Sequence, residues 1–312
     1  MTDSPYTIRN YQPADFDNYV RLCREAEKLE PLGRTVSTQA ITECLVRPDY
    51  SPEQDLFVVE GAGDIVGYMD MTPELDIGRV ILDCWLRPEH RRRGLATELL
   101  VYAMRRAKEL GAGILHVNVT EDNEVAIAVL SMLGFKCIRR FLEFKLDMYK
   151  LPGQEANQAA QECGHLRHGE EAKLTQIQNQ CFAGTWGYNP NTVATITYRT
   201  HLSHFSPEDV ALASEEGKII GYCWAEIAGG KKEGEGRIYM LGVGPDYRGK
   251  GVGKTLLLSG LARLSSKGVR VAVLTVDSEN KAACALYRSV GFELQANSLW
   301  YEKAVTQATG AS

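Results

Sequence analysis

The residues best suited to chemistry form a glycine-rich turn with basic side chains, at 248–254. The turn consists of Arg248, Gly249, Lys250, Gly251, Val252, Gly253 and Lys254. Glycines at this spacing leave backbone N–H groups uncovered, because no Cβ blocks the approach of an anion. An apolar segment of helical periodicity follows, so the free amides at the start of that helix should point at the same place. The turn therefore predicts a binding site for a phosphate or diphosphate group.

A second turn of the same kind lies upstream, at 91–96. It consists of Arg91, Arg92, Arg93, Gly94, Leu95 and Ala96. Arg91 and Arg248 are 157 positions apart, and the same separation joins Asn123 to Asn280. The Gly-Phe pairs at 134 and 291 also have this separation. Because the separation is constant from 91 to 135, it indicates an internal duplication.

Each copy is expected to place its turn between a strand and a helix. The strands are predicted at Val80–Leu86 and Arg237–Val243. Hairpins precede each turn and alternating strands and helices follow it, so the predicted class is a mixed α+β fold. The last residues of the two strands lie beside the turns and are further candidate binding residues: Cys84, Trp85 and Leu86 in the first copy, and Leu241, Gly242 and Val243 in the second.

The duplication predicts two domains, an N-terminal one at 1–150 and a C-terminal one at 165–312. A polar segment with few apolar residues, 151–164, is the predicted linker. An earlier match, between 65–68 and 219–222, has a separation of only 154 positions, so a small insertion or deletion lies between the paired segments. The second copy is expected to end in two strands, at 292–295 and 299–305.

Composition excludes several classes of protein. The net charge of −5 argues against a nucleic-acid surface, which needs basic residues to neutralise phosphates. No apolar run approaches the length of about 18 residues that a membrane span needs, and the first residues lack the features of a signal peptide. The eight cysteines form no C-x-x-C pair and mostly lie in apolar runs. We therefore expect buried, reduced thiols, no metal site and a cytoplasmic protein.

The motifs together resemble the GCN5-related N-acetyltransferase superfamily, in a tandem arrangement that covers about 5–150 and 165–305. The family's Arg-x-x-Gly-x-Gly/Ala turn is matched twice, and its late signature is matched by Asn280, Tyr287, Gly291 and Phe292. The resemblance implies acetyl-CoA as cofactor, lying between two splayed parallel strands with its diphosphate on the turn. Those strands would be Arg237–Val243 and Val269–Val276, or Val80–Leu86 and Ile114–Val119 in the first copy. Asn280 would orient the cofactor arm or the helix before Tyr287, and Asn123 is the matching cofactor-binding candidate of the first copy.

The two copies differ at the residue expected to act as general acid. Tyr287 could give a proton to the departing thiolate; an aromatic residue on a helix can instead be a packing residue, but the spacing of Tyr287 to Asn280 and Gly291 favours the acid. The equivalent residue of the first copy is Leu130, which has no proton to give. We therefore expect the C-terminal domain to be catalytic and the N-terminal domain to be degenerate. Glu235 and Glu226 are the candidates for the general base, and the sequence does not choose between them.

The expected function is transfer of an acetyl group from acetyl-CoA to a primary amine of a small molecule. The segment 181–190 is rich in aromatic residues and glycine and is the predicted wall of the acceptor pocket, or else a core plug. Two alternatives stay open: acetylation of a protein or peptide amine, and a non-catalytic sensor that binds CoA. The chain is expected to be a monomer, in which the two domains form a pseudo-dimer, or a homodimer, with neither a nucleic-acid nor a membrane partner.

Overall fold

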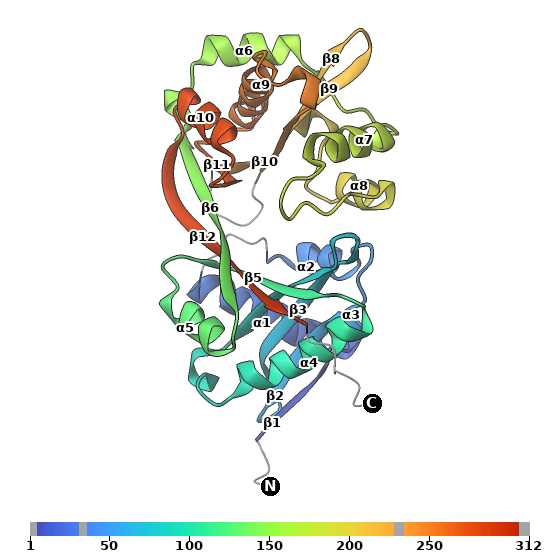
Figure 1. Cartoon of the computed structure of the whole chain (residues 1–312), viewed down its shortest axis with the longest axis vertical. Coiled ribbons are helices and arrows are strands. Elements are labelled where there is room, and N and C mark those ends of the chain that lie inside the picture. Colours follow the sequence, from blue (N-terminus) through green and yellow to red (C-terminus); the bar gives the residue numbers. More distant parts are fainter. Residues whose placement is uncertain (1–4, 31–35, 228–233, 306–312) are drawn as a thin grey trace. The chain divides into compact units, whose positions relative to one another are not determined.

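The computed structural model describes residues 5–30, 36–227 and 234–305 (Figure 1). These residues form two compact units. The first contains the described parts of Met1–Arg139 and Ser298–Ser312, and the second contains the described part of Arg140–Asn297. Each unit is a mixed sheet with helices packed on both faces, which confirms the predicted α+β class.

The first unit has its strands in the order β1-β2-β3-β4-β5-β12. Only β4 and β5 are parallel among the strand pairs that the structure describes here. One face packs against α1 and α2, and the other against α4 and α5. The elements are β1 (Tyr6–Asn10), α1 (Phe16–Leu29), α2 (Thr38–Leu45), α3 (Pro52–Asp55), β2 (Leu56–Gly61), β3 (Asp64–Glu74), β4 (Arg79–Leu86), α4 (Leu95–Glu109), β5 (Ile114–Thr120), α5 (Glu124–Met132) and the end of β12 (Glu293–Ala304).

The second unit repeats this plan, with the strand order β6-β11-β10-β9-β8-β7. Its parallel pair is β10 and β11. Helices α9 and α10 pack on one face, and α7 and α8 on the other. The elements are β6 (Lys136–Asp147), α6 (Gly153–Glu162), β7 (Gly164–His165), α7 (Glu171–Phe182), α8 (Val193–Thr200), β8 (Val210–Glu215), β9 (Lys218–Ile227), β10 (Glu235–Val243), α9 (Val252–Ser266), β11 (Val271–Asp277), α10 (Lys281–Val290) and the start of β12.

The two halves of the sequence exchange their last strands. Residues 141–147 of β6 pair with β11 in the second unit, and residues 298–304 of β12 pair with β5 in the first. A hydrogen bond of 2.9 Å between His116 Nε2 and Glu302 Oε2 ties the exchanged β12 to β5. The prediction of two separate strands at 292–295 and 299–305 is wrong, because β12 is one continuous strand over Glu293–Ala304. The compact units therefore do not coincide with the two halves in chain order.

The segment expected to be a linker, 151–164, forms part of the second unit. Helix α6 begins directly after Pro152, which cannot continue a helix from the preceding segment. Ala156 and Ala159 are buried, and α6 packs along α9. Glu155 Oε2 lies 3.2 Å from Lys254 Nζ, so α6 also contacts the start of α9.

The eight cysteines are free thiols, but the expectation that most are buried is wrong. Cys181, Cys223 and Cys284 are buried, whereas three are exposed: Cys44, Cys84 and Cys137. Alternation along the strands explains two of these exposed thiols, because Cys84 and Cys137 lie on β4 and β6 and apolar flanks do not determine which face a strand residue occupies. No helix within the described residues has both the length and the apolar character needed to cross a bilayer.

Candidate active site

The parallel strands of the second unit diverge, as the sequence predicts. Pairing between β10 and β11 runs only from Glu235–Val271 to Arg237–Val273, although both strands continue beyond it. We call this place, where the pairing ends, the fork. On the other side of β10 the register with β9 shifts between Ile238 and Met240, so Tyr239 is a bulge residue. Within the described residues, β11 leaves 239–243 of β10 unpaired, and an extended ligand can use these backbone groups.

The first unit has a fork of the same kind. Pairing between β4 and β5 runs from Arg79–Ile114 to Ile81–His116 and stops there. The register between β3 and β4 is continuous from Gly67–Leu86 to Glu74–Arg79, without a bulge. Both copies therefore open their parallel strands, but only the second inserts an extra residue beside the opening.

The glycine-rich turn of the second unit presents a set of free amides. Gly249 and Gly251 have φ values of 75° and 88°, which residues with a Cβ rarely adopt. Gly251 is the N-cap of α9, so Val252 and Gly253 begin the helix. No described residue accepts a backbone hydrogen bond from the amides of 249–253. With Lys250 and Lys254 alongside, these amides fit the diphosphate of a CoA molecule.

Arg248 braces the turn from behind. Its Nε donates to the carbonyl oxygen of Val243 at 3.1 Å, and its Nη2 donates to that of Cys181 at 2.7 Å. Arg91 does the same in the first unit, where its Nε donates to the carbonyl oxygen of Leu86 at 2.9 Å. Each arginine therefore ties its turn to the end of the preceding strand, and the amides are the groups that face outward.

The turn of the first unit adopts the same backbone with a different sequence. Gly94, with a φ of 82°, is the N-cap of α4. Arg92 stands where the second unit has Gly249, and its φ of 58° is the same left-handed conformation. Arg93 lies over the ring of Tyr6, with its guanidinium carbon 5.8 Å from the ring centre. Leu95 and Ala96 begin α4, where Leu95 is buried in the core and Ala96 is half-buried.

The strand ends beside the two turns differ. A Cβ on Gly242 would lie 2.7 Å from the ring of Tyr222 and 2.8 Å from Cβ of Cys181, so the backbone there is closely covered. Trp85 occupies the equivalent position of the first unit and is buried against the α1 side of the sheet. Leu241 and Val243 are half-buried on the α9 side, beside the fork.

Asn123 and Asn280 cap the helices that follow the second strands of the two forks. Asn123 Oδ1 accepts from the amide of Ala126 at 3.0 Å, and Asn280 Oδ1 accepts from the amide of Ala283 at 3.1 Å. Both side chains are therefore helix caps, and orienting the helix is one of the two roles expected for Asn280. Through this cap Asn280 fixes the start of α10, which carries Tyr287.

Tyr287 lies on the α9 side of the sheet, at the fork. It is buried in one cluster with Leu274 and Val276 of β11, and the half-buried Leu241 packs against that cluster. Its ring centre is 6.0 Å from that of Phe292. Burial holds the pKa of Tyr287 above its usual range, so the phenol keeps its proton at neutral pH. Leu130 is the buried equivalent in the first unit.

The two candidate bases occupy different places. Glu226 pairs across β9 and β10 with Arg237, the last residue before the fork. Burial raises the pKa of Glu226, and the nearby His204, Arg199 and Arg237 oppose that shift. Glu235 pairs with Val271 at the closed end of the strand pair, two residues before the fork. Of the two candidates, Glu226 is therefore the one whose strand partner borders the fork.

The face of the sheet opposite α9 carries residues that the sequence analysis did not identify. Arg237 Nη2 lies 3.8 Å from Glu143 Oε2 on β6. Phe141, also on β6, has its ring centre 5.9 Å from that of Trp186, in the segment expected to wall the acceptor pocket. Glu143 and Phe141 come from the first half of the sequence, and no motif signals the strand exchange that brings them here.

The bulge residue Tyr239 is held on the same face. Its ring centre is 5.5 Å from that of Trp224, and its hydroxyl accepts a hydrogen bond from Arg199 of α8. These contacts fix the bulge between the sheet and the helices that cover it. A bulge of one residue has no sequence signature by itself. In this sequence it shows only as a change in the number of residues that separate the two repeats.

Comparisons with known proteins agree with this geometry. The family model of the acetyltransferase (GNAT) family matches residues 22–135 and 172–292. A mycothiol acetyltransferase of Mycobacterium sp. (strain MCS) is 30% identical over 246 residues, which cover 75% of this chain and 77% of that one. Two solved structures share the fold: a GCN5-related N-acetyltransferase from Sphaerobacter thermophilus (TM-score 0.72, 21% identity, 98% of both chains) and a tandem GNAT protein from the clavulanic acid biosynthesis pathway (TM-score 0.71, 14% identity, 97% and 99%). The chain therefore belongs to the GNAT family, as an acetyl-CoA-dependent N-acetyltransferase with two family domains in tandem.

Proposed function

We propose that the second unit acetylates a primary amine of a small molecule. One observation carries this proposal: only the second of the two forks has both a bulge and a buried tyrosine beside it. The relatives named mycothiol acetyltransferase support a small-molecule acceptor. Trp186 and Phe141 support it too, because an aromatic wall beside the fork suits a small ligand better than an open groove would.

The amides of 249–253 and the charges of Lys250 and Lys254 would hold the diphosphate of acetyl-CoA. Bound there, acetyl-CoA supplies the activated acetyl group as a thioester. A backbone N–H of β10 that faces the fork, near Val243, would donate to the carbonyl oxygen as negative charge develops on it. The bulge at Tyr239 helps, because it turns backbone groups away from the ladder with β9.

Two side chains would move protons in this mechanism. Glu226 lies on the face of the sheet opposite α9, which we call the acceptor face, and would take a proton from the incoming amine, directly or through water. Tyr287, on the opposite face, would give its proton to the departing thiolate. Their placement on the two sides of the fork suits opposite proton transfers, since the amine nitrogen approaches the carbonyl carbon to form the new C–N bond while the thiolate departs from it in another direction as the C–S bond breaks.

The test is acetyl transfer to a panel of small amines, with Tyr287→Phe and Leu130→Met as matched variants. Turnover by the wild type that falls in the Tyr287 variant and persists in the Leu130 variant supports the proposal. Binding of CoA without transfer to any amine would favour the sensor alternative. Equal turnover by the wild type and both variants would remove Tyr287 from the mechanism.

A further inference from the structure

The acceptor face of the second unit carries two cations for which the described residues provide no hydrogen-bond acceptor. Arg237 and Lys145 flank Val273, since Val273 pairs with Arg237 on one side and with Lys145 on the other. Among the described residues, neither the Arg237 guanidinium nor Lys145 Nζ has a hydrogen-bond acceptor. The Arg237–Glu143 pair, at 3.8 Å, is an ion pair beyond hydrogen-bond distance.

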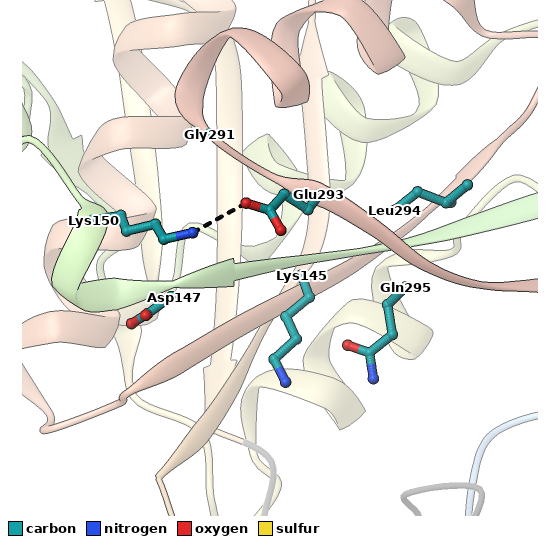
Figure 2. Close-up of a pocket in the computed structure, with 7 residues that line it drawn as sticks. All are labelled: Lys145, Asp147, Lys150, Gly291, Glu293, Leu294 and Gln295. Atoms are coloured by element: carbon teal, nitrogen blue, oxygen red, sulfur yellow. Dashed lines mark hydrogen bonds and ion pairs between the residues drawn. The ribbon is translucent and has the colours of Figure 1, made fainter.

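Both side chains lie on the face opposite α9. On β6, Phe144 and Leu146 are buried under α9 and α10, so alternation places Glu143 and Lys145 on the other face. Figure 2 shows Lys145 and Gln295 on the same side of their strands, with the ion pair of Lys150 and Glu293 apart from them. The backbones of Arg237 and Lys145 are two strand spacings apart, about 10 Å. Both side chains are long enough to contact the same small ligand group from the two sides.

The half-exposed Arg237 is also the last residue before the fork. A guanidinium offers five N–H donors in one plane, a geometry that matches a carboxylate. Within the described part of the chain, the guanidinium of Arg237 uses none of these donors. The neighbouring carboxylates of Glu226 and Glu143 keep the face from being strongly positive, and they suit an ammonium group. Such a mixed surface fits a ligand that carries both charges.

We propose that the acceptor is an amine that also carries a carboxylate, held by Arg237 with Lys145 beside it. This inference rests on the proposed function of the same site and deepens it by naming the class of acceptor. Arg237 acts as a specificity residue: it binds the carboxylate and so directs the amine of the same molecule toward the fork. An amine without a carboxylate leaves this cation unused and should be a poorer acceptor.

The test uses amines in matched pairs that differ only by a carboxylate: β-alanine and ethylamine, γ-aminobutyrate and propylamine, L-lysine and cadaverine, and L-phenylalanine and phenethylamine. Acetyl transfer is measured for each, and binding is measured by calorimetry with CoA present. At least one carboxylated amine should exceed its partner by about tenfold or more in kcat/KM or affinity, as expected for a charge-assisted hydrogen bond. Arg237→Gln should abolish that preference through KM, and Lys145→Gln should reduce it.

The matched control is Lys150→Gln, since Lys150 follows the end of β6 and is paired with Glu293. It should leave the preference unchanged. The inference is overturned if no carboxylated amine binds or reacts better than its partner, or if Arg237→Gln keeps the preference. Transfer to plain amines with no such preference would overturn this inference alone, whereas CoA binding without any transfer would overturn the proposed function.

Discussion

The two units share the parts that hold an anion and differ in the parts that would do chemistry. Both have a turn of free amides before a helix and a fork between parallel strands. Only the second has the bulge at Tyr239, and only it has Tyr287 where the first has Leu130. At the strand end, the second has Gly242 and the first has the indole of Trp85.

The difference shows which features of the fold tolerate divergence. The amide turn depends on backbone conformation, and the first unit keeps it even with Arg92 in a left-handed conformation. The acid and the bulge depend on one side chain and one inserted residue, so a single change removes each. Binding of an anion can therefore outlast catalysis in a duplicated domain.

The largest effect should come from removing the exchanged strand. A chain that ends at 297 loses Leu299, Tyr301 and Val305 from the core of the first unit and leaves β5 with an open edge. Deleting these three buried side chains should destabilise that unit by on the order of 5 kcal/mol or more. Hydrogen exchange should show β4 and β5 unprotected while β10 and β11 keep their protection. A chain that ends at Val305 is the control, and loss of protection in both units alike would contradict the exchange.

Next in size is the loss of the proposed acid. Tyr287→Phe keeps the ring and removes the proton, so kcat should fall by about 100-fold or more while CoA binding stays unchanged. Leu130→Met, at the matched position, should leave kcat unaltered because no proton is expected to move there. Steady-state kinetics and calorimetry measure the two effects separately. A fall in CoA affinity instead of kcat would assign Tyr287 to packing.

A smaller, pH-dependent effect should follow from Glu226→Gln. Because burial raises the pKa of Glu226, wild-type kcat/KM should fall as pH decreases through that pKa, and the variant should lose this limb of the profile. Stability should respond in the opposite sense. The wild type loses stability as pH rises from the unfolded value through the raised pKa, so the variant should gain relative to it over that window.

Glu235→Gln is the control for this comparison. Glu235 lies at the closed end of the strand pair, so its variant should keep the wild-type profile of kcat/KM. If Glu235→Gln removed the acidic limb and Glu226→Gln did not, the assignment of the base would be reversed. Urea unfolding at several pH values supplies the stability readout.

Local features were predictable from the sequence, and features that join distant segments were not. The turns, their glycines and the caps Asn123 and Asn280 depend on a few neighbouring residues, whose conformational preferences are strong. The strand exchange depends on whether residues 141–147 pair within their own half of the sequence or with β11. The apolar alternation of these residues fits either partner. The sequence therefore predicted the number of domains but not which strands complete the sheet of each domain.

The bulge is an intermediate case, because the sequence holds its trace. Strand pairing aligns Ile81 with Arg237 and Leu86 with Val243, so the separation of the repeats rises from 156 to 157 within the strand. Tyr239 thus accounts for one residue of the three-residue change in the repeat separations. Its place could not be predicted, since an insertion in a loop changes the separation in the same way.

The smallest expected effect tests whether the two turns have the same backbone conformation. Arg92, with a φ of 58°, carries a left-handed strain of roughly 1–2 kcal/mol that Gly249 avoids in the second unit. Arg92→Gly removes this strain but adds freedom to the unfolded chain, which costs about 0.5–1 kcal/mol. The variant should therefore be more stable by about 0.5–1 kcal/mol, measured by urea unfolding of the first unit, with unchanged acetyl transfer. Arg93→Gly, at a neighbouring position of the same turn that has no positive φ, should instead lose stability, and an equal loss in both variants would show that the turns differ in backbone.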